Sequence, residues 1–359
     1  MAKSIKIGHK RVGDNCPTFI IAEASSNHNG DLNMAKEMVL AAKDTGADCI
    51  KFQTFSADEF CADKESSFSY QSQGTTVVEK MYDMFKRFEF SDQEWLELKL
   101  FCDQNDILFL TTVQDTVNLD MLLKIGLEGI KVGSDDFDHT LNLERYAKTG
   151  LPIILSKGMA DLSEVDRIIN FLRNLTDRLL IMHCVSLYPV DPELMNIRQV
   201  QTLKYLYPEI IWGFSDHSKG TLASTIAVSL GAQLIEKHFT LDHDLPGPDH
   251  WFSMDPSEFS KLVKDIRITE KALGSGNIVP APGEIDMKNI MRRRIIAKND
   301  IPEGSIIDEQ LICFKRAENG CFANQWDLIK NQKSAASIKQ NSPISLSDIN
   351  FCKTSKIKK

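Results

Sequence analysis

The chain has 359 residues, of which 42% are hydrophobic and 26% are charged, and 42 basic against 50 acidic residues give a formal net charge of −8. This composition excludes a disordered or fibrous chain, and the acidic balance leaves no electrostatic footprint for nucleic acid. The length predicts two domains, or one large domain followed by a small one.

Neither a membrane segment nor a disulfide framework is expected from the sequence. The first residues, Met1-Ala-Lys-Ser-Ile-Lys, lack the apolar core of a signal peptide, and no apolar run approaches the ~18 residues of a membrane span. The eight cysteines are scattered and form no C-x-x-C pair. Such cysteines are typical of a reducing compartment, so we expect a cytoplasmic protein.

Short apolar runs alternate with helical periodicity over the first 270 residues. The runs predict strands at Thr18–Glu23, Cys49–Gln53, Ile107–Thr112, Gly129–Gly133, Ile153–Ser156, Leu179–His183, Ile210–Phe214 and Gln233–Phe239. Helices are predicted at Leu32–Thr45, Asp92–Gln104, Val117–Ile125, Leu143–Lys148, Ser163–Leu172, Ile197–Leu206 and Thr221–Leu230. Strands that are apolar throughout are buried on both faces, as in parallel sheets. Strand–helix units repeated over about 250 residues predict a (β/α)₈ TIM barrel, with a doubly wound open sheet as the alternative.

The predicted barrel domain covers residues 1–276 and ends after a last helix, Pro256–Leu273. Residues 277–291 contain the breakers Pro280-Ala281-Pro282-Gly283 and predict a linker. Short alternating segments predict a small second domain at residues 292–352, and a basic tail follows at 353–359.

Polar side chains gather at the predicted carboxyl ends of the strands, where the active site of such a barrel lies. They are Glu23, Lys51, Gln53, Thr111, Thr112, Lys131, Ser134, Ser156, His183, Ser215, Asp216, His217, Glu236, Lys237 and His238. A structural role can explain each of these residues separately, but it explains the whole set poorly. We therefore expect a site for a metal or an anion at this end of the barrel.

His217 and His238 end two strands that are neighbours in the barrel. Imidazoles on adjacent strands with a carboxylate nearby make an open site for a divalent cation. The candidate carboxylates are Glu23, which becomes a neighbour when the barrel closes, and Asp249, in the loop after the eighth strand. Alternatively, each histidine only hydrogen-bonds a backbone carbonyl.

Two lysines, Lys51 and Lys131, close the second and fourth strands. Three serines are predicted at the same rim: Ser134, Ser156 and Ser215. Ammonium groups together with hydroxyls suit a phosphate dianion. The alternatives are an internal ion pair of Lys131 with Asp135 or Asp136, and a Schiff base on Lys131 or Lys157, which would indicate an aldolase without a metal.

Several motifs of these strand ends carry a specific resemblance. They are Ile21–Gly30 (IAEASSNHNG), Ala47–Thr54 (ADCIKFQT), Gly213–His217 (GFSDH), Ile235–Thr240 (IEKHFT) and Pro246–His250 (PGPDH). On these motifs the chain closely resembles the sialic acid (N-acetylneuraminate) synthase family, which includes the legionaminic and pseudaminic acid synthases and a spore-coat polysaccharide enzyme. The resemblance runs over nearly the whole chain, and it implies a TIM barrel followed by a small antifreeze-like (SAF) α+β domain.

The resemblance implies the condensation of phosphoenolpyruvate with an N-acylated mannosamine-type aldehyde sugar, with release of phosphate and with Mn²⁺ or Mg²⁺ as cofactor. It implies that His217 and His238 bind the metal, and that Glu23 and Asp249 act on the sugar hydroxyls, on the metal-bound water and in proton transfer. The positions implied for substrate binding are Lys51, Gln53, Lys131, Ser134, Asp136, Ser156, Tyr188, Ser215 and Arg316. Arg316 matches an arginine that one subunit extends into its partner's barrel, which implies a domain-swapped homodimer.

Departures from the family pattern gather on the sugar side. Asp135-Asp136 replaces Gly-Glu, Lys157 replaces a usual Thr, Ser186 replaces an Asn, and Met287 and Ile290 replace residues that meet the sugar. We therefore expect N-acetylneuraminate synthase activity, with legionaminic or pseudaminic acid synthesis as the alternative within the family. A metal- or Schiff-base-dependent keto-acid aldolase is the alternative from another class. A C-terminal domain that binds ice or polysaccharide, with the barrel as scaffold, is a further alternative.

Overall fold

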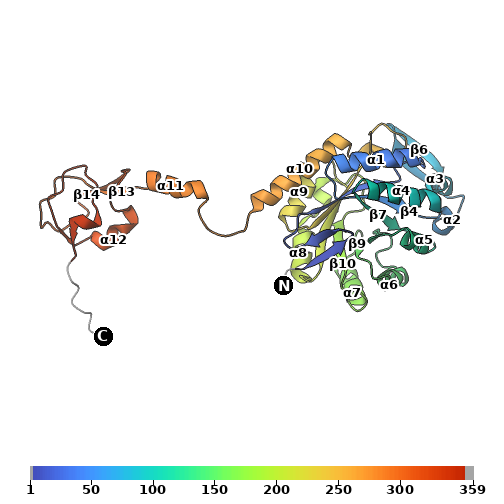
Figure 1. Ribbon diagram of the computed structural model, residues 1–359, viewed down its shortest axis with the longest axis horizontal. Helices are drawn as coiled ribbons and strands as arrows, with labels where there is room; N and C mark the ends of the chain where they lie inside the picture. Colours follow the sequence, from blue (N-terminus) through green and yellow to red (C-terminus); the bar gives the residue numbers. More distant parts are fainter. Residues whose placement is uncertain (1–2, 352–359) are drawn as a thin grey trace. The chain divides into compact units, whose positions relative to one another are not determined.

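The computed structural model describes residues 3–351 of the chain. These residues form two compact units, the first ending at Gly274 and the second beginning at Ser275 (Figure 1). The predicted basic tail, 353–359, lies outside the described residues.

The first unit is a closed barrel of eight parallel strands. In barrel order they are β3 (Phe19–Ser25), β4 (Cys49–Thr54), β7 (Leu108–Val113), β8 (Ile130–Val132), β9 (Ile153–Ser156), β10 (Leu179–Cys184), β11 (Ile211–Asp216) and β12 (Leu234–His238). Each strand overlaps one of the predicted apolar runs, so the TIM-barrel prediction is confirmed and the open sheet is wrong.

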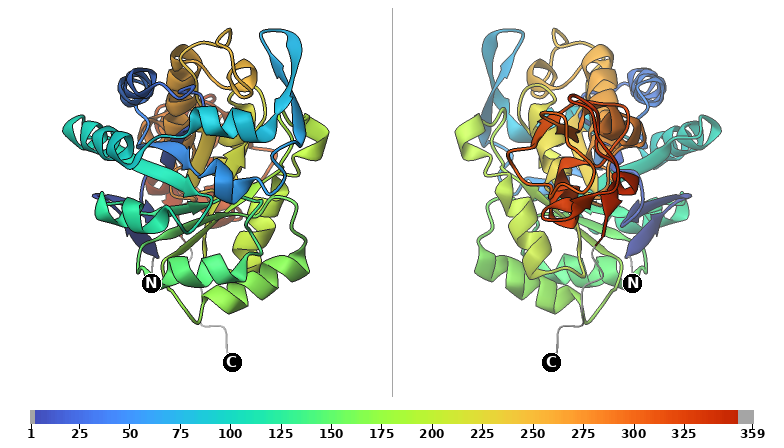
Figure 2. Two further views of the ribbon diagram at one scale, coloured as in Figure 1. Left: turned by 90° about the vertical axis from the view of Figure 1, so that its right-hand side faces the viewer. Right: turned by 90° about the vertical axis from the view of Figure 1, so that its left-hand side faces the viewer.

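Helices surround the barrel, as Figure 2 shows. They are α1 (Leu32–Asp44), α4 (Asp92–Gln104), α5 (Leu119–Lys124), α6 (Thr140–Lys148), α7 (Leu162–Leu172), α8 (Arg198–Leu206), α9 (Leu222–Ser229) and α10 (Pro256–Leu273). Side-chain caps start several of them. Ser91, Asp161 and Asp255 each accept a hydrogen bond from a backbone N–H of the first turn, with a glutamate returning the contact. These capping boxes satisfy N–H groups that would otherwise lack partners.

Side chains alternate between the two faces of each strand, and this alternation separates the core into two parts. Outward residues such as Phe52, Phe214 and Ile235 pack in one cluster with the helices. Inward residues such as Ile21, Leu180 and Leu234 form a second apolar cluster inside the barrel. Further along several strands the inward positions turn polar, as at Glu23 of β3, Ser156 of β9 and Glu236 of β12. The apolar cluster is therefore the floor beneath a polar end.

An antiparallel hairpin before the barrel, β1 (Ser4–Ile7) and β2 (Lys10–Gly13), is absent from the predictions. Its Ile5, Ile7 and Val12 are buried in the same cluster as the inward strand residues. The hairpin therefore closes the barrel interior with apolar side chains.

A second unpredicted excursion lies between β4 and α4. It consists of α2 (Ala57–Phe60), the antiparallel hairpin of β5 (Ser67–Ser72) and β6 (Thr75–Lys80), and α3 (Met81–Phe88). The hairpin projects from the barrel unit in light blue in Figure 2. Arg87 of α3 pairs with Glu79 at 2.9 Å, and Glu79 accepts a 2.6 Å hydrogen bond from the hydroxyl of Tyr70, which ties the hairpin to α3.

The second unit has its own small core, which includes Ile295, Ile307, Ile329 and Ile344. Its elements are α11 (Pro282–Met291), β13 (Arg294–Ala297), β14 (Ile312–Lys315), α12 (Trp326–Ile329), β15 (Lys333–Ser334) and β16 (Ile349–Asn350). Within the segment predicted as a linker, Pro282–Met291 is helical: Pro282 stands at the first turn, where its missing N–H costs no hydrogen bond.

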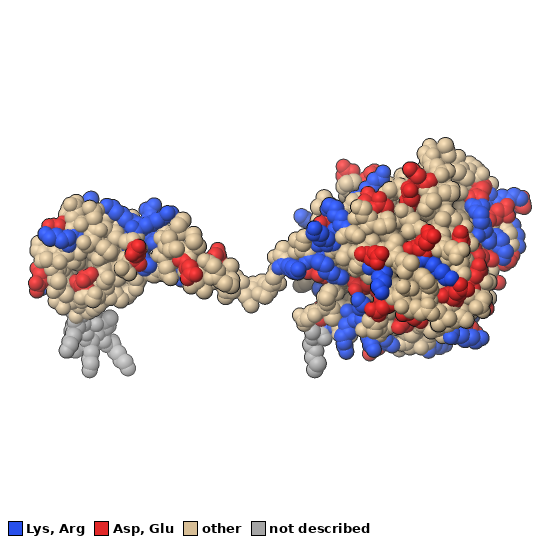
Figure 3. Space-filling view, turned by 45° about the horizontal axis from the view of Figure 1, so that its top comes forward, with Lys and Arg blue, Asp and Glu red and all other residues tan. Residues whose placement is uncertain are grey.

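On the face of the barrel unit that Figure 3 shows, basic and acidic side chains are interspersed. This face does not present the continuous basic surface that nucleic-acid binding uses. Within residues 3–351, no helix combines the length and apolar character needed to cross a bilayer. The cysteines of this part of the chain are free, and Cys352 lies beyond it.

The β1–β2 hairpin, which closes the barrel interior, leads to a prediction about stability. Ile7→Ala removes a fully buried side chain from the floor and should lower the free energy of unfolding of the first unit by about 2–5 kcal/mol, because it leaves a cavity. Urea unfolding followed by tryptophan fluorescence measures this loss. Lys6→Ala, an exposed neighbour on the same strand, should change stability by less than about 0.5 kcal/mol. Equal effects of the two substitutions would contradict the role of the β1–β2 hairpin in closing the barrel interior.

Candidate active site

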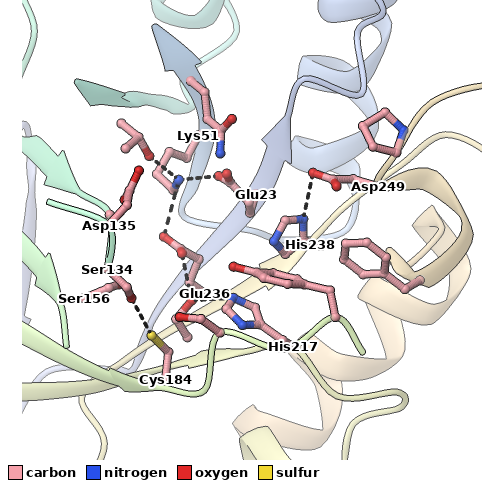
Figure 4. Close-up of a pocket in the computed structure, with 18 of the residues that line it drawn as sticks. Glu23, Lys51, Ser134, Asp135, Ser156, Cys184, His217, Glu236, His238 and Asp249 are labelled. Carbon is pink, nitrogen blue, oxygen red and sulfur yellow. Dashed lines mark hydrogen bonds and ion pairs between the residues drawn. The ribbon is translucent and has the colours of Figure 1, made fainter. Parts of the chain in front are cut away.

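A cavity of about 590 Å³ opens at the carboxyl ends of the barrel strands (Figure 4). The predicted site residues that line it are Glu23, Lys51, Gln53, Lys131, Ser134, Ser156, Tyr188, Ser215, His217, His238 and Asp249. Glu23, Lys51, Gln53, Lys131, Ser156, Ser215 and His238 lie on strands and meet because inward positions at the strand ends face one axis. Ser134, Tyr188, His217 and Asp249 lie in the segments that follow strands. Asp136 does not line the cavity, and neither do Thr111, His183, Asp216 and Lys237 of the wider strand-end set. Arg316 belongs to the second unit.

A buried network of charges forms the base of the cavity. The ammonium of Lys51 lies 2.6 Å from a carboxylate oxygen of Glu23 and 3.8 Å from one of Glu236. Lys131 lies 3.7 Å from Glu236. These four side chains are at most 6% exposed, so water screens their charges little.

The two carboxyl groups differ in protonation. Burial raises the pKa of Glu23 to about 8, with Lys51 opposing the shift. Burial also acts to raise the pKa of Glu236, but Lys131 and Lys51 outweigh it and hold that pKa below its usual value. Burial would lower the pKa of Lys51, yet Glu23 and Glu236 raise it. At pH 7 the network therefore holds two ammonium groups against one ionised carboxylate, a positive charge suited to an anionic ligand.

Hydroxyl groups surround the two lysines. Lys51 donates a 2.7 Å hydrogen bond to Thr112, and Lys131 donates a 2.8 Å bond to Ser156. Ser215 donates to Glu236 at 2.9 Å, and Ser134 accepts from the backbone N–H of Gly158 at 3.0 Å. Together with the ammonium groups, these hydroxyls offer the donors that a phosphate or a carboxylate needs. The alternative pairing of Lys131 with Asp135 or Asp136 is not observed, because its carboxylate partner is Glu236.

The two histidines lie side by side, with ring centroids 5.5 Å apart. His217 Nδ1 lies 2.7 Å from the carbonyl oxygen of Val185. A carbonyl only accepts, so Nδ1 carries the proton and Nε2 keeps its lone pair. Metal-ligating histidines commonly have their other N–H held by a carbonyl in this way.

His238 has the second feature expected of a ligand. Its Nδ1 is buried without a hydrogen-bond partner, and the nearest carboxylate oxygen, of Asp249, lies 3.8 Å away. Burial lowers the pKa of both imidazoles, so they are neutral at pH 7, as metal binding requires. Two adjacent neutral imidazoles, one with an unpaired buried nitrogen, fit a divalent cation, and His217 and His238 would hold it.

Asp249 and Tyr188 occupy the mouth of the cavity beside the histidines. Asp249 accepts a 2.8 Å hydrogen bond from Ser25, and burial raises the pKa of its carboxyl group. The ring of Tyr188 lies 4.2 Å from that of His217, and the ring of Phe252 lies 5.1 Å from that of His238. The rings of Tyr188 and Phe252 thus place apolar surface against the two histidines.

The other predicted residues lie elsewhere. Asp135 lines the cavity, whereas Asp136 points toward His139, 3.6 Å away. Arg316 directly follows β14 in the second unit. Lys157 donates to Gln199 at 2.6 Å and does not line the cavity. A Schiff base on Lys157 in this cavity is therefore wrong as an alternative.

Several lining residues are absent from the predicted set. They are Phe68, Ser69, Tyr70, Gln71, Gln114, Cys184, Trp251 and Phe252, among others. Glu236, by contrast, belongs to the strand-end set expected from the sequence, and it shares a face with His238, two residues later on the same strand. In β5 only Phe68 and Tyr70 alternate with polar residues, and this is a weaker signal than the continuous apolar runs of the barrel strands.

A second group of possible metal ligands lies outside the cavity. His243, Asp255 and Glu258 present ligand atoms within 4.8 Å of one another. Asp255 and Glu258 already form the capping box of α10, which accounts for their proximity. This group is therefore a structural cap, and His243 serves below as a control.

The raised pKa of Glu23 leads to a prediction about stability and pH. A carboxyl group whose pKa rises on folding stabilises the fold below its unfolded pKa, and this stability is lost as pH rises through about 8. Glu23→Gln, which stays neutral, should match the wild-type melting temperature at pH 5 and exceed it by several degrees at pH 9. Differential scanning calorimetry without ligands measures this difference. Glu37→Gln, at an exposed position on α1, should show no such trend; a flat difference for Glu23→Gln would contradict the raised pKa.

Comparisons with known proteins agree with this site. The model of the NeuB family matches residues 38–278, and that of the SAF domain matches residues 292–350. The uncharacterized protein MJ1065 of Methanocaldococcus jannaschii is 41% identical over 92% of this chain and 94% of its own length. The N,N'-diacetyllegionaminic acid synthase of Legionella pneumophila is 38% identical over 87% of this chain and 89% of its own.

A solved structure shares the fold. The N-acetylneuraminic acid (sialic acid) synthetase of Leptospira borgpetersenii matches with a TM-score of 0.72 and 38% identity, covering 81% of this chain and 98% of its own. These matches confirm the resemblance found in the strand-end motifs and the SAF domain expected after the barrel. The chain therefore belongs to the NeuB family, with a SAF domain after its barrel.

Proposed function

We propose that this protein condenses phosphoenolpyruvate with an N-acylated mannosamine-type aldehyde sugar, releasing phosphate and forming a nine-carbon α-keto acid. The observation that carries the proposal is that two neutral histidines and two buried lysines line the same cavity. A relative named as a legionaminic acid synthase and a solved structure named as a sialic acid synthetase support it.

The lysines bind and orient phosphoenolpyruvate in this proposal. Lys51 and Lys131, with Ser134, Ser156 and Ser215, hold its phosphate and carboxylate near the floor of the cavity. Their charges offset the charge that develops on the departing phosphate. Holding the enol close to the aldehyde replaces a bimolecular encounter with an oriented one.

The bonds change in a defined order. C3 of phosphoenolpyruvate attacks the aldehyde carbon, forming the new C–C bond, and the former carbonyl oxygen takes up a proton. Water adds to C2 and loses a proton, and the C2–O bond to phosphate then breaks to leave the α-keto acid. Glu23, protonated below pH 8, and Asp249 are the groups placed to exchange these protons. A divalent cation held by His217 and His238 would polarise the aldehyde as a Lewis acid.

We propose N-acetylmannosamine as the acceptor, which makes the protein an N-acetylneuraminate synthase. The second candidate is a 6-deoxy 2,4-diacetamido sugar, which the 38% identity to the legionaminic acid synthase favours. We also propose a domain-swapped homodimer in which the partner subunit supplies an arginine equivalent to Arg316, and an enzyme that works in the cytoplasm, where its free cysteines stay reduced.

Phosphate release tests the reaction class. Phosphate should appear only when phosphoenolpyruvate, an acceptor sugar and Mn²⁺ or Mg²⁺ are all present, and a panel of acceptor sugars should rank N-acetylmannosamine first. Cleavage of a keto acid without phosphate release would overturn the proposal in favour of an aldolase. A higher kcat/KM for a diacetamido sugar would keep the reaction and replace the acceptor.

His217→Ala should abolish metal binding and turnover together while the barrel stays folded. Outer partners of metal ligands already change affinity 10–100-fold, so loss of a ligand should reduce Mn²⁺ affinity by roughly 100-fold or more. Isothermal titration with Mn²⁺ and circular dichroism measure both properties. His243→Ala, at the capping box of α10, is the matched control and should bind Mn²⁺ as the wild type does. Loss of binding in His243→Ala alone would move the metal to that group.

Arg316→Ala should raise the KM for the sugar far more than the KM for phosphoenolpyruvate. A lost hydrogen bond from a charged group corresponds to roughly a 10- to 100-fold change. Steady-state kinetics with each substrate varied in turn measures the two constants, and Arg293→Ala is the control within the same unit. An equal rise in both constants would show that Arg316 does not contact the sugar.

A further inference from the structure

We propose that the buried ion pair of Asp216 and Lys237 positions the metal-binding histidines, by fixing the carboxyl ends of β11 and β12 relative to each other. This inference rests on the proposed function, because it concerns the same site. Asp216 and Lys237 lie behind the cavity and do not line it.

The pair stands beside the histidines on both strands. Asp216 directly precedes His217, and Lys237 directly precedes His238. Asp216 and Lys237 are register partners, and their charged atoms lie 3.0 Å apart. Since neighbouring residues on a strand point to opposite faces, the charged pair points outward while the imidazoles point into the cavity.

Asp216 also connects three further groups to the pair. One carboxylate oxygen accepts hydrogen bonds from the backbone N–H of Ser218 at 2.8 Å and from its hydroxyl at 2.6 Å. The other oxygen accepts from the hydroxyl of Ser224 on α9 at 2.6 Å. Lys237 in turn donates to the carbonyl oxygen of Ser218. The strand β11, the turn after it, the helix α9 and the strand β12 are thereby joined by one buried network.

The place of the ion pair in the strands indicates that it orients the histidines more than it stabilises the fold. Two residues earlier on the same strands, the outward register partners are Phe214 and Ile235, which pack in the apolar cluster with the helices. Burying charges is costly, and a buried ion pair often stabilises a fold no better than apolar side chains do. A hydrogen-bonded ion pair is more directional than apolar packing, so it holds the two strand ends in one relative arrangement.

This constraint on the two strands matters most where their pairing ends. Asp216–Lys237 is the last register pair of β11 and β12, and His217 lies one residue beyond it. A metal bound by two imidazoles needs both nitrogens within coordination distance at once; in zinc sites that distance is about 2.0–2.1 Å. A shift of about half an ångström between the strand ends disturbs such a site. The ion pair fixes the backbone at this point.

The test replaces both charges together. Asp216→Asn with Lys237→Met leaves no unpaired charge, so the double variant should melt within a few degrees of the wild type. Its affinity for Mn²⁺ alone, measured by isothermal titration without substrates, should fall at least tenfold. Its affinity for phosphoenolpyruvate should stay within twofold, because the lysines of the cavity are untouched. Restoring Lys237 and Asp216 one at a time should not restore Mn²⁺ affinity, since each single variant leaves one charge unpaired.

The matched control is the pair of Lys99 and Asp103 on α4, in which Lys99 is also buried and the contact is 2.6 Å. Lys99→Met with Asp103→Asn should leave Mn²⁺ affinity unchanged. If the Asp216/Lys237 double variant does not fold, Ser224→Ala replaces it as the test, because it removes one hydroxyl from Asp216. It should then lower Mn²⁺ affinity about threefold, and an unchanged affinity would overturn the inference.

The two proposals fail in different ways. Wild-type Mn²⁺ affinity in a folded double variant overturns the positioning role and leaves the reaction intact. A wild-type protein that binds Mn²⁺ through His217 but releases no phosphate overturns the proposed function, while the effect of the double variant on Mn²⁺ affinity still decides the positioning role.

Discussion

The site depends on one constraint: in a closed barrel, every second residue of each strand must face the interior. On β11 this places Ser215 on the cavity side, with His217 two residues later, just past the end of the strand. On β12 it places Glu236 and His238 there. The same rule puts apolar residues such as Leu234 on the inward face nearer the amino ends of the strands. An apolar floor and a polar end thus arise from a single period of two. The buried charges of Glu23, Lys51, Lys131 and Glu236 therefore meet without a loop to bring them together.

This geometry forces opposite charges into a space from which water is largely excluded. Two lysines that face one axis repel each other unless an acid lies between them, and Glu236, close to both Lys51 and Lys131, fills that place. Glu23 stays neutral at pH 7 because burial outweighs its attraction to Lys51. A network with one more positive than negative group attracts a dianion, and the carboxylate between the lysines limits the repulsion between their charges. The net charge of −8 for the whole chain is therefore compatible with an anionic ligand, because the field that matters is local.

The sequence predicted what is encoded locally and missed what depends on tertiary contacts. The eight barrel strands were predictable because their apolar runs are long and fully buried. The β5–β6 hairpin was missed because Ser67–Ser72 is mostly exposed and has only Phe68 and Tyr70 alternating with polar residues, with no continuous apolar run. The choice between Asp135 and Asp136 depends on how one turn is oriented after β8, which spacing does not encode. The alternative partners considered for Lys131, Asp135 and Asp136, are wrong for the same kind of reason: its partner Glu236 is 105 positions away in the chain and close only after the barrel closes.

The buried charges and the outer wall of the cavity are built from different parts of the chain, so the two can vary separately. Lys51, Lys131, Glu23 and Glu236 lie on strands whose positions the barrel fixes, so replacing any of them disturbs the charge balance of the buried network. The wall toward solvent is built from other parts, namely β5 of the projecting hairpin and the segment around Trp251 and Phe252. Substitutions there change the shape of the cavity without touching the buried charges. Two relatives at 38% identity carry the names of different acids, legionaminic and N-acetylneuraminic, as such an arrangement allows.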